Sequence, residues 1–285
     1  MGLLRRQEGP VALGNLPQAQ STRPAAGGRP LYSVENTWKE IRDAGVQIAV
    51  IAIGAIEQHG HHLPLGTDWF QVDHVARRLA EKLDAFYCPA MPYGNSWEHQ
   101  RFPGSLSLRP ETLAAVLRDI VLCLRDHGIS KIVVVNGHGA NWILKPTVRQ
   151  LNYDYPDLTI IWSNGVNPED GGEPPVEIHS GLSETSRMMY LRPDLVKDEG
   201  VVNSPGIVGQ EFLDYVGFDR VTKTGAWGCP ADGATPERGE EILDASVESS
   251  ARYVRWAFAR IEEFKSQPSV VERDRVPGRE SQEES

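Results

Sequence analysis

Three short apolar runs rich in β-branched residues limit what this chain can fold into. They read VQIAVIAIG (46–54), KIVVVN (131–136) and LTIIWSN (158–164). Runs of this kind are typical of strands that are buried on both faces of a parallel sheet, because such strands have no solvent-facing side. A fourth stretch, AFYCPAMPYG (85–94), fits a shorter strand that leads into a loop.

Segments with the periodicity of amphipathic helices separate these runs. Apolar side chains recur at helical spacing in 69–83 and in 111–128, and the stretch 141–152 is a further candidate helix. Alternating strands and helices at this spacing indicate crossover connections between parallel strands. We therefore predict an α/β fold: a single-domain sandwich with a largely parallel sheet covered by helices.

The two ends of the chain have a different composition. Residues 1–30 are rich in Gly, Pro, Gln and Arg without any period, and residues 266–285 are charged with almost no large apolar side chains. Such segments cannot bury enough apolar surface to fold by themselves, so we predict that both are disordered. The folded domain would then span residues 31–265.

Charge and cysteine content exclude some partners. The net charge of −10 argues against nucleic acid or an anionic membrane surface as a partner. No apolar run reaches the ~18 residues that a membrane-spanning helix needs. The three cysteines, Cys88, Cys123 and Cys229, are widely spaced and odd in number, which is typical of reduced thiols in a cytoplasmic protein. We expect a small-molecule substrate and a cytoplasmic location.

Polar side chains follow the predicted strands. Glu57 and His59 come just after the first run, His138 follows KIVVVN, and Asn164 ends LTIIWSN. Open parallel sheets bind ligands at the edge formed by the carboxyl ends of their strands. Residues far apart in the sequence are therefore expected to converge there.

The stretch AIEQHGHHLPLGTD (55–68) carries the residue types of a divalent-metal site. Glu57 and His59 share one face of an extended backbone, and Asp68 follows a loop that contains Pro and Gly. Histidine nitrogen and carboxylate oxygen bind zinc at ~2.0–2.2 Å, and one carboxylate can bridge two cations ~3.5–4 Å apart. Together with His138, these residues would form a workable set of ligands.

Each segment also has an ordinary structural explanation. A Glu and a His after a strand are often solvated, and NGHGAN around His138 could be only a glycine-rich turn. The stretch HSGLSETS (179–186) could start a helix, with Ser183 as its cap and Glu184 in its first turn. We interpret His61 and His62 as residues that orient the loop. The three segments taken together favour the metal site.

Five segments in this order resemble the signature blocks of the creatininase (creatinine amidohydrolase) family. They are GAIEQHGHHLPLGTD, YGNSWEHQRFPGSLSL, VVVNGHGAN, HSGLSETSRMMYLRPDLV and GAWGCPADGATPERG. The resemblance covers roughly residues 35–262. It implies a Rossmann-like three-layer α/β sandwich, two divalent metal ions (Zn, Mn or Fe) per subunit, hydrolysis of amide-like C–N bonds, and a homo-oligomer, often a hexamer built from dimers.

The resemblance also implies roles for the matching residues. Glu57 and His138 match ligands of one metal, His59 matches a ligand of the other, and Asp68 matches the bridging carboxylate. A water held between the two cations would be the nucleophile, because two cations lower its pKa toward neutrality.

Residues of the later blocks match catalytic and substrate-binding positions. His179 matches the histidine implicated in proton transfer to the leaving nitrogen, and Glu184 matches the acidic residue that follows it. Four further residues that flank the site are candidates for substrate contacts: Trp97, Glu98, His99 and Trp142.

The chain departs from creatininase itself at two places. There the third block reads His-Tyr-Glu-Asn and its Glu is a metal ligand, whereas here Ala140 holds that position. We expect Glu184 to complete the ligands of the second metal; otherwise that metal would be weakly held. The tryptophan expected a few residues before His179 is also missing from EPPVEIHSG. Creatinine is therefore not the expected substrate, and we predict another branch of the family.

Three functions are compatible with these features. The first is a metal-dependent amidohydrolase that cleaves a C–N bond by way of a metal-bridging hydroxide. The second is a hydrolase of a keto-inositol or similar sugar-like ring, and the third is a non-catalytic, metal-binding scaffold. Because every expected ligand and catalytic position except Ala140 holds a competent residue, the sequence favours the first.

Overall fold

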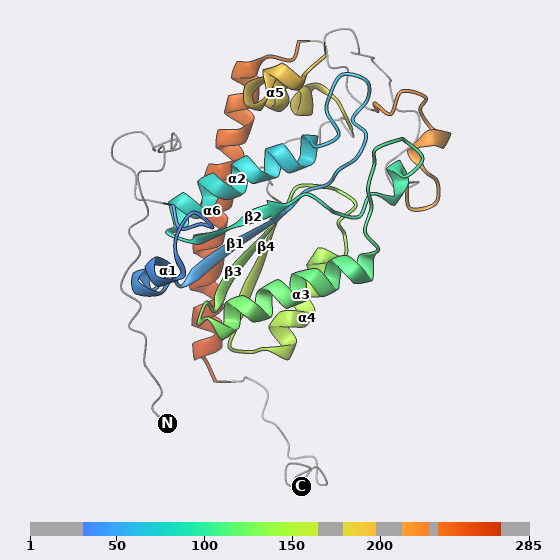
Figure 1. Cartoon of the computed structure of the whole chain (residues 1–285). Helices are drawn as coiled ribbons and strands as arrows, with labels where there is room; N and C mark the ends of the chain where they lie inside the picture. Colours follow the sequence, from blue (N-terminus) through green and yellow to red (C-terminus); the bar gives the residue numbers. More distant parts are fainter. Residues whose placement is uncertain (1–30, 165–178, 198–212, 228–232, 269–285) are drawn as a thin grey trace, which may run out of the picture. The chain divides into compact units, whose positions relative to one another are not determined.

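The computed structural model describes residues 31–164, 179–197, 213–227 and 233–268. Four parallel strands form one sheet in the order β2-β1-β3-β4 (Figure 1). The strands are β1 (Ile48–Ile53), β2 (Phe86–Met91), β3 (Lys131–Asn136) and β4 (Thr159–Asn164). The α-helices of the described residues are α1 (Trp38–Ala44), α2 (Thr67–Leu83), α3 (Pro110–Asp126), α4 (Leu144–Asp154), α5 (Leu182–Leu191) and α6 (Pro236–Ser266).

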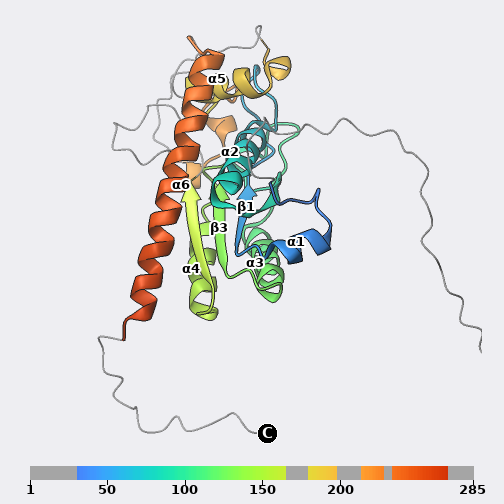
Figure 2. The same ribbon diagram turned by 90° about the vertical axis from the view of Figure 1, so that its left-hand side faces the viewer.

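Helices cover both faces of the sheet, which confirms the predicted α/β fold. Alternate residues of β1 point into different layers: Val50 packs with α2 and α6, whereas Ile51 packs with α3 and α4. Figure 2 shows α6 running beside β4 on one side of the sheet and α4 on the other. Burying a Val or Ile side chain contributes about 1.5–3 kcal/mol, so both layers depend on the apolar runs seen in the sequence.

Helix boundaries differ from the predictions by a few residues, and two differences concern the site. Helix α2 starts at Thr67, so that Asp68 lies in its first turn. Helix α5 starts at Leu182 with Gly181 as its N-cap, so that Ser183 lies inside the helix and does not cap it. Helix α1, which has 7 residues and no buried side chain, was not predicted from the sequence.

The end of β1 and the start of α2 approach each other closely. A Cβ atom at Gly54 would lie 2.7 Å from Cα of Trp69 and 3.2 Å from the carbonyl carbon of Asp68. A larger residue at position 54 would therefore push the first turn of α2 away from the strand. The helix dipole also favours a carboxylate in that turn. This close approach holds Asp68 over the carboxyl end of β1.

Some sequence predictions concern residues outside the described ones. These are the predicted disorder of 1–30, most of the predicted C-terminal tail (269–285), and the thiol of Cys229. Cys88 and Cys123 are free thiols. Among the described helices, none is both long and apolar enough to cross a membrane.

Candidate metal centre

The predicted ligands gather at the carboxyl ends of neighbouring strands. Ile53 of β1 is in register with Asn136 of β3, so the segments that follow the two strands emerge side by side. Glu57 and His59 come from the first segment and His138 from the second. The side chains of all three are buried. The convergence expected from the sequence is therefore present for these residues.

Asp68 lies between the histidines of the two segments. Its Oδ1 atom is 3.3 Å from Nε2 of His59, and its Oδ2 atom is 3.0 Å from Nδ1 of His138. The two oxygens thus face different histidines. This is the placement that a carboxylate shared by two cations requires.

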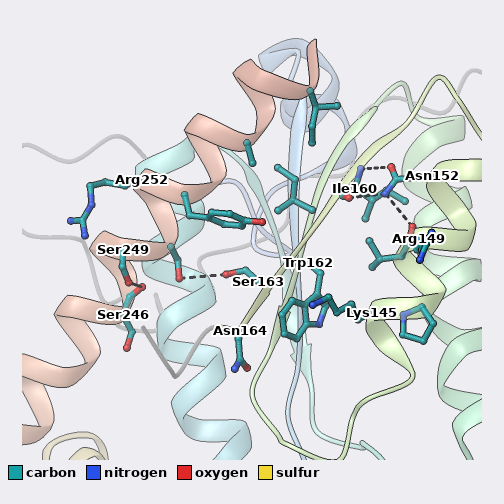
Figure 3. A pocket seen from close by; sticks show the side chains of 17 residues that line it. Lys145, Arg149, Asn152, Ile160, Trp162, Ser163, Asn164, Ser246, Ser249 and Arg252 are labelled. Carbon is teal, nitrogen blue, oxygen red and sulfur yellow. Dashed lines mark hydrogen bonds between the residues drawn. The ribbon is translucent and has the colours of Figure 1, made fainter. Parts of the chain in front are cut away.

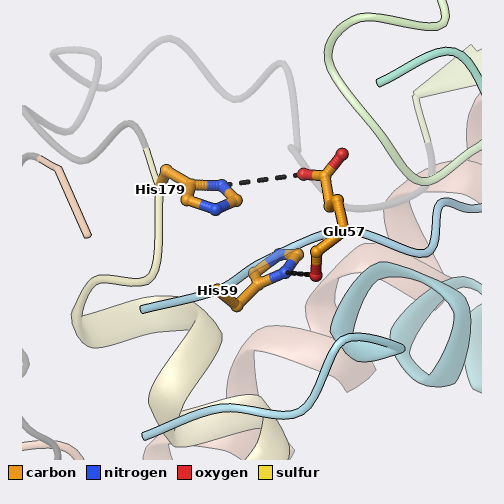
Figure 4. Close-up of side chains that lie close together, drawn as sticks. All are labelled: Glu57, His59 and His179. Carbon is orange, nitrogen blue, oxygen red and sulfur yellow. Dashed lines mark hydrogen bonds and ion pairs between the residues drawn. The ribbon is translucent and has the colours of Figure 1, made fainter. Parts of the chain in front are cut away.

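Three overlapping groups of side chains offer three ligand atoms each, within 4.8 Å of one another. The first is His59, Asp68 and Glu184, and the second is Glu57, Glu98 and His138. The third, Glu57, His59 and His179, is drawn in Figure 4. Glu98, expected from the sequence to contact substrate, therefore also lies where it could bind a metal: its Oε1 atom is 3.4 Å from Nε2 of His138.

The environment of Glu57 fits a bound cation. Its side chain is fully buried, and neither carboxylate oxygen has an aligned hydrogen-bond donor among the described residues. Burial raises the pKa of Glu57 to about 8, although the nearby His138 opposes this shift. A buried carboxylate without hydrogen bonds is costly, and a divalent cation would compensate for it.

His59 is oriented as metal-binding histidines usually are. Its Nδ1 atom donates to the backbone oxygen of Glu57 at 3.2 Å, which leaves Nε2 facing Asp68 and Glu184. A ring nitrogen fixed in this way directs the other nitrogen toward the metal. Burial alone would lower the pKa of His59, but the two carboxylates outweigh burial and raise it to about 9.

The other members of the cluster have shifted pKa values for the same reasons. Burial disfavours the ionised form of Asp68, but the attraction of His59 and His138 holds its pKa well below the usual range. Burial also opposes the charged form of His138, whereas Glu57 and Asp68 raise its pKa well above the ordinary histidine value. Without metal, the cluster is therefore a compact set of opposite charges.

Gln58 fixes the protonation of a further histidine, His99. The Oε1 atom of Gln58 accepts from the N–H of Gly60 at 3.0 Å, and its Nε2 atom donates to the oxygen of Gly225 at 3.1 Å. These two contacts distinguish the oxygen of the Gln58 amide from its nitrogen. The same Nε2 atom lies 2.7 Å from Nδ1 of His99, which must therefore accept. The proton of neutral His99 is on Nε2, which lies 3.3 Å from Oε1 of Glu57.

His179 is held with one ring nitrogen available. Its Nε2 atom donates to the backbone oxygen of Gln58 at 2.6 Å, and its Nδ1 atom is 3.8 Å from Oε1 of Glu57 (Figure 4). Burial and the neighbouring His59 hold the pKa of His179 well below its usual value. His179 is therefore neutral near pH 7, with a lone pair on Nδ1 that can accept a proton.

Glu184 reaches the cluster from the first turn of α5. Its Oε2 atom accepts from the N–H of Ser180 at 2.6 Å and lies 3.8 Å from Nε2 of His59. The position of Glu184 is compatible with the expectation that it takes the place of the ligand missing at Ala140. His62 instead pairs its Nε2 atom with the hydroxyl of Thr185 at 2.9 Å, and His61 is exposed. Both belong to the loop and to none of the three metal-competent groups.

A cavity of about 680 Å³ adjoins the cluster. Three of the four predicted substrate contacts, Trp97, Glu98 and Trp142, line it together with Ala140. The fourth, His99, does not line this cavity; its Nε2 atom lies 3.3 Å from Oε1 of Glu57.

The larger cavity, about 830 Å³, lies elsewhere (Figure 3). It follows the free edge of β4 between α4 and α6, and its lining includes Trp162, Ser163 and Asn164. None of the predicted metal ligands lines it. Asn164, at the end of β4, therefore faces this cavity and does not belong to the three metal-competent groups.

Several residues of the site were missed by sequence reasoning. Gln58 contacts His99 through its side chain and His179 through its backbone oxygen. In the sequence, only its position between Glu57 and His59 pointed to a role in the site. Phe218 packs its ring 4.2 Å from that of His99 and 5.1 Å from that of His179, measured between centroids. No pattern in the sequence connects Phe218 with the histidines, because the contact depends on how the chain folds back.

The fold and the cluster define the class of protein: an α/β protein with groups of side chains that could hold a metal ion at the carboxyl edge of its sheet. The family model for creatininase, described as creatinine amidohydrolase, matches residues 34–254. The chain belongs to the creatininase family of hydrolases.

Its relatives differ in what they act on. A creatinine amidohydrolase from Pseudomonas putida is 31% identical over 250 residues, which are 79% of this chain and 96% of that protein. A mycofactocin precursor peptide peptidase from Mycobacterium tuberculosis is 34% identical over 228 residues, which are 73% of this chain and 84% of that protein. Family membership therefore does not define the substrate.

Solved structures agree with the fold. A creatininase variant of Zn-Zn type matches with a TM-score of 0.69 at 30% identity, covering 81% of this chain and 99% of that one. A structure of creatininase with Mn matches with the same TM-score and identity, covering 80% of this chain and 99% of that one.

Proposed function

We propose that the protein is a metal-dependent amidohydrolase that cleaves an amide-like C–N bond in a small molecule. The observation that carries this proposal is the position of Asp68, whose two oxygens face His59 and His138 at 3.3 and 3.0 Å. Zinc and manganese, found in the related creatininase structures, and also iron, suit such a set of imidazole and carboxylate ligands.

Two divalent cations would divide the ligands between them. Glu57 and His138 would hold one, His59 and Glu184 the other, and Asp68 would bind both. When bound, the pair would supply Lewis acidity and lower the pKa of a bridging water, so that hydroxide is available near neutral pH. Glu184 would replace the carboxylate ligand that Ala140 cannot provide.

The protein's own residues would move the proton. In neutral His179 the Nε2–H group donates to the backbone oxygen of Gln58. The Nδ1 atom would therefore accept a proton from the nucleophile. The same atom then delivers that proton to the leaving nitrogen, which needs it to depart as an amine. Phe218 packs edge to face against this ring, and Trp227 packs edge to face against Phe218.

The branch of the family follows from the ligand set and from the missing tryptophan. We propose a substrate other than creatinine, because Ala140 stands where creatininase has a ligand and EPPVEIHSG lacks the tryptophan that encloses creatinine. We also propose a cytoplasmic homo-oligomer, a hexamer as in the family. Two exposed aromatic residues on α6, Tyr253 and Trp256, support a subunit contact, because exposed apolar groups of this size often mark interfaces.

Elemental analysis of the purified protein tests the metal centre. We expect about two divalent ions per chain in the wild type and a sharp loss in Asp68→Asn, with circular dichroism unchanged. Asp119→Asn removes an exposed carboxylate on α3 and is the matched control. A wild type without metal after handling free of chelators would refute the proposal.

An amide panel tests the reaction. The metal-loaded wild type is offered linear and cyclic amides and formamides, and the release of amine or formate is measured. Turnover that disappears in both Asp68→Asn and His179→Ala, but not in Asp119→Asn, supports the assigned roles. Retained turnover in His179→Ala would remove that residue from proton transfer.

A further inference from the structure

Among the described residues, the cavity beside the predicted metal ligands carries charge of one sign only. Its volume is about 680 Å³, and its described lining contains the carboxylates of Glu98 and Asp214 but no Lys, Arg or His. A substrate group with a negative charge would therefore meet only like charges among the described lining residues.

Aromatic side chains supply much of the remaining lining. Trp97, Trp142 and Tyr215 come from three separate segments, and their exposed fractions are 51%, 57% and 82%. Large aromatic groups exposed together in a cavity have faces free to contact a ligand. The segment that carries Tyr215 is packed against Trp97–His99: a Cβ at Gly217 would lie 3.3 Å from the backbone oxygen of Glu98.

Glu98 connects this cavity to the ligand cluster. Its Oε1 atom is 3.4 Å from Nε2 of His138, and its side chain also lines the cavity. A substrate whose reacting carbonyl lies at the cluster must therefore extend past Glu98 toward the aromatic groups and Asp214. The chemistry of that second part of the substrate is set by these side chains.

Aromatic faces combined with carboxylates select organic cations. The face of a Trp or Tyr ring is negative and attracts ammonium groups, and a nearby carboxylate adds to this attraction. We propose that the cavity binds the non-reacting part of the substrate and that this part carries an organic ammonium group. This inference rests on the proposed function only in that it locates the reacting bond at the metal cluster.

A pair of isosteric probes tests the charge preference. Choline and its neutral carbon isostere, 3,3-dimethylbutan-1-ol, have nearly the same shape and the same hydroxyl group. Binding of each to the metal-loaded full chain is measured by calorimetry or by saturation-transfer NMR. We expect choline to bind about tenfold more tightly, which corresponds to ~1.4 kcal/mol and lies within the range of cation–π contacts. Equal binding, or tighter binding of the alcohol, would overturn the proposal.

Three variants localise the effect. Asp214→Asn and Trp142→Leu should each lower choline affinity severalfold while leaving the weak binding of the alcohol nearly unchanged. Asp119→Asn makes the same charge change on the exposed face of α3 and should leave both affinities as they are. Choline binding that is unaffected in Asp214→Asn and Trp142→Leu would place the cation elsewhere and overturn the proposal.

The same samples separate this inference from the proposed function. Metal content and amide turnover are recorded beside probe binding. Selective choline binding without metal or turnover would support the cavity assignment and refute the hydrolase. Metal and turnover without any preference for choline would support the hydrolase and refute the cavity assignment.

Discussion

His59 and Asp68 face each other inside the protein, with Nε2 of the histidine 3.3 Å from Oδ1 of the carboxylate. Asp68 holds its carboxylate in the first turn of α2, and His59 follows β1, so two separate elements meet at this contact. The other oxygen of Asp68 faces His138. Charge balance in the cluster therefore depends on whether protons or metal ions neutralise the carboxylates.

Metal binding should release protons. In the metal-free protein the pKa of His59 is raised to about 9 and that of Glu57 to about 8, so both hold a proton at pH 7. A metal needs the lone pairs that these protons occupy. We expect zinc binding at pH 7 to release more than one proton per chain, and this number to fall as the pH rises through 8 to 9. Calorimetry in buffers of different ionisation enthalpy measures it.

The apparent affinity for zinc should depend on pH. Because protons compete with the metal, apparent zinc affinity should increase with pH until the shifted groups have lost their protons, and then level off. His59→Ala should release fewer protons, whereas His61→Ala changes an exposed histidine two residues away and is the matched control. Zinc binding without proton release at pH 7 would contradict the assignment of His59 and Glu57 as ligands.

A carboxylate at position 140 should be able to replace the carboxylate of Glu184 as a ligand of the second cation. Glu184→Gln keeps an oxygen that can accept from the N–H of Ser180 but removes the charge near His59. We expect it to weaken the second cation at least about tenfold, since even residues that only orient metal ligands have effects of ~10–100-fold. Adding Ala140→Glu, which restores the carboxylate found in creatininase, should recover much of that affinity. Titration against a chromogenic chelator measures both.

Two outcomes would speak against this exchange. Glu184→Gln with unchanged affinity for both ions would show that Glu184 is not a ligand. Ala140→Glu with no recovery would show that the carboxylate at this position does not reach the second cation. Ala140 lines the cavity and is partly exposed, so a larger side chain has room there.

The layered fold was predictable because its signal is local. The β-branched runs of β1 and β3 have no polar face, so the sequence alone shows that both sides of these strands are buried. The helix α1 was missed for the opposite reason: its stability comes from a capping box between Thr37 and Glu40, without a buried side chain. An apolar pattern cannot reveal a helix of this kind.

The cluster was predictable only in part. Glu57, His59 and His138 lie directly after strands, so topology alone places them together. The contacts of Gln58 with Gly225 and of Phe218 with His99 join segments far apart in the sequence, and no local pattern encodes them. The resemblance supplied roles for His179 and Glu184, but the proximity of Glu98 to His138 came from the structure.

The thiol of Cys88 should be unreactive in the folded protein. Burial raises its pKa to about 12, so at pH 8 only about one molecule in ten thousand carries the reactive thiolate. Cys123 is exposed on α3. In a Cys229→Ser background, we expect one thiol to react rapidly with Ellman's reagent and the second only on unfolding in urea. Rapid reaction of both thiols would indicate that β2 opens locally in the native protein.

Gly225 should be needed for the orientation of Gln58. It has a φ of +85°, and a Cβ atom there would lie only 1.7 Å from Oε1 of Gln58. The side chain of Gln58 would have to move away from the oxygen of Gly225 and from His99. Gly128 is the matched control, because its φ is +83° and nothing lies within 4 Å of a Cβ there. Both alanine variants bear the left-handed backbone cost of roughly 1–2 kcal/mol.

The difference between the two variants isolates the contact with Gln58. Because two hydrogen bonds of about 1 kcal/mol each are disturbed, we expect Gly225→Ala to lower the free energy of unfolding by ~2 kcal/mol more than Gly128→Ala. Urea denaturation of the metal-free protein measures this difference. Gly225→Ala should also weaken zinc binding, since a shift of Gln58 would displace His99, whose Nε2 atom lies 3.3 Å from Oε1 of Glu57, whereas Gly128→Ala should not. Equal effects of both variants on stability and on zinc affinity would show that Gln58 has no part in positioning the cluster.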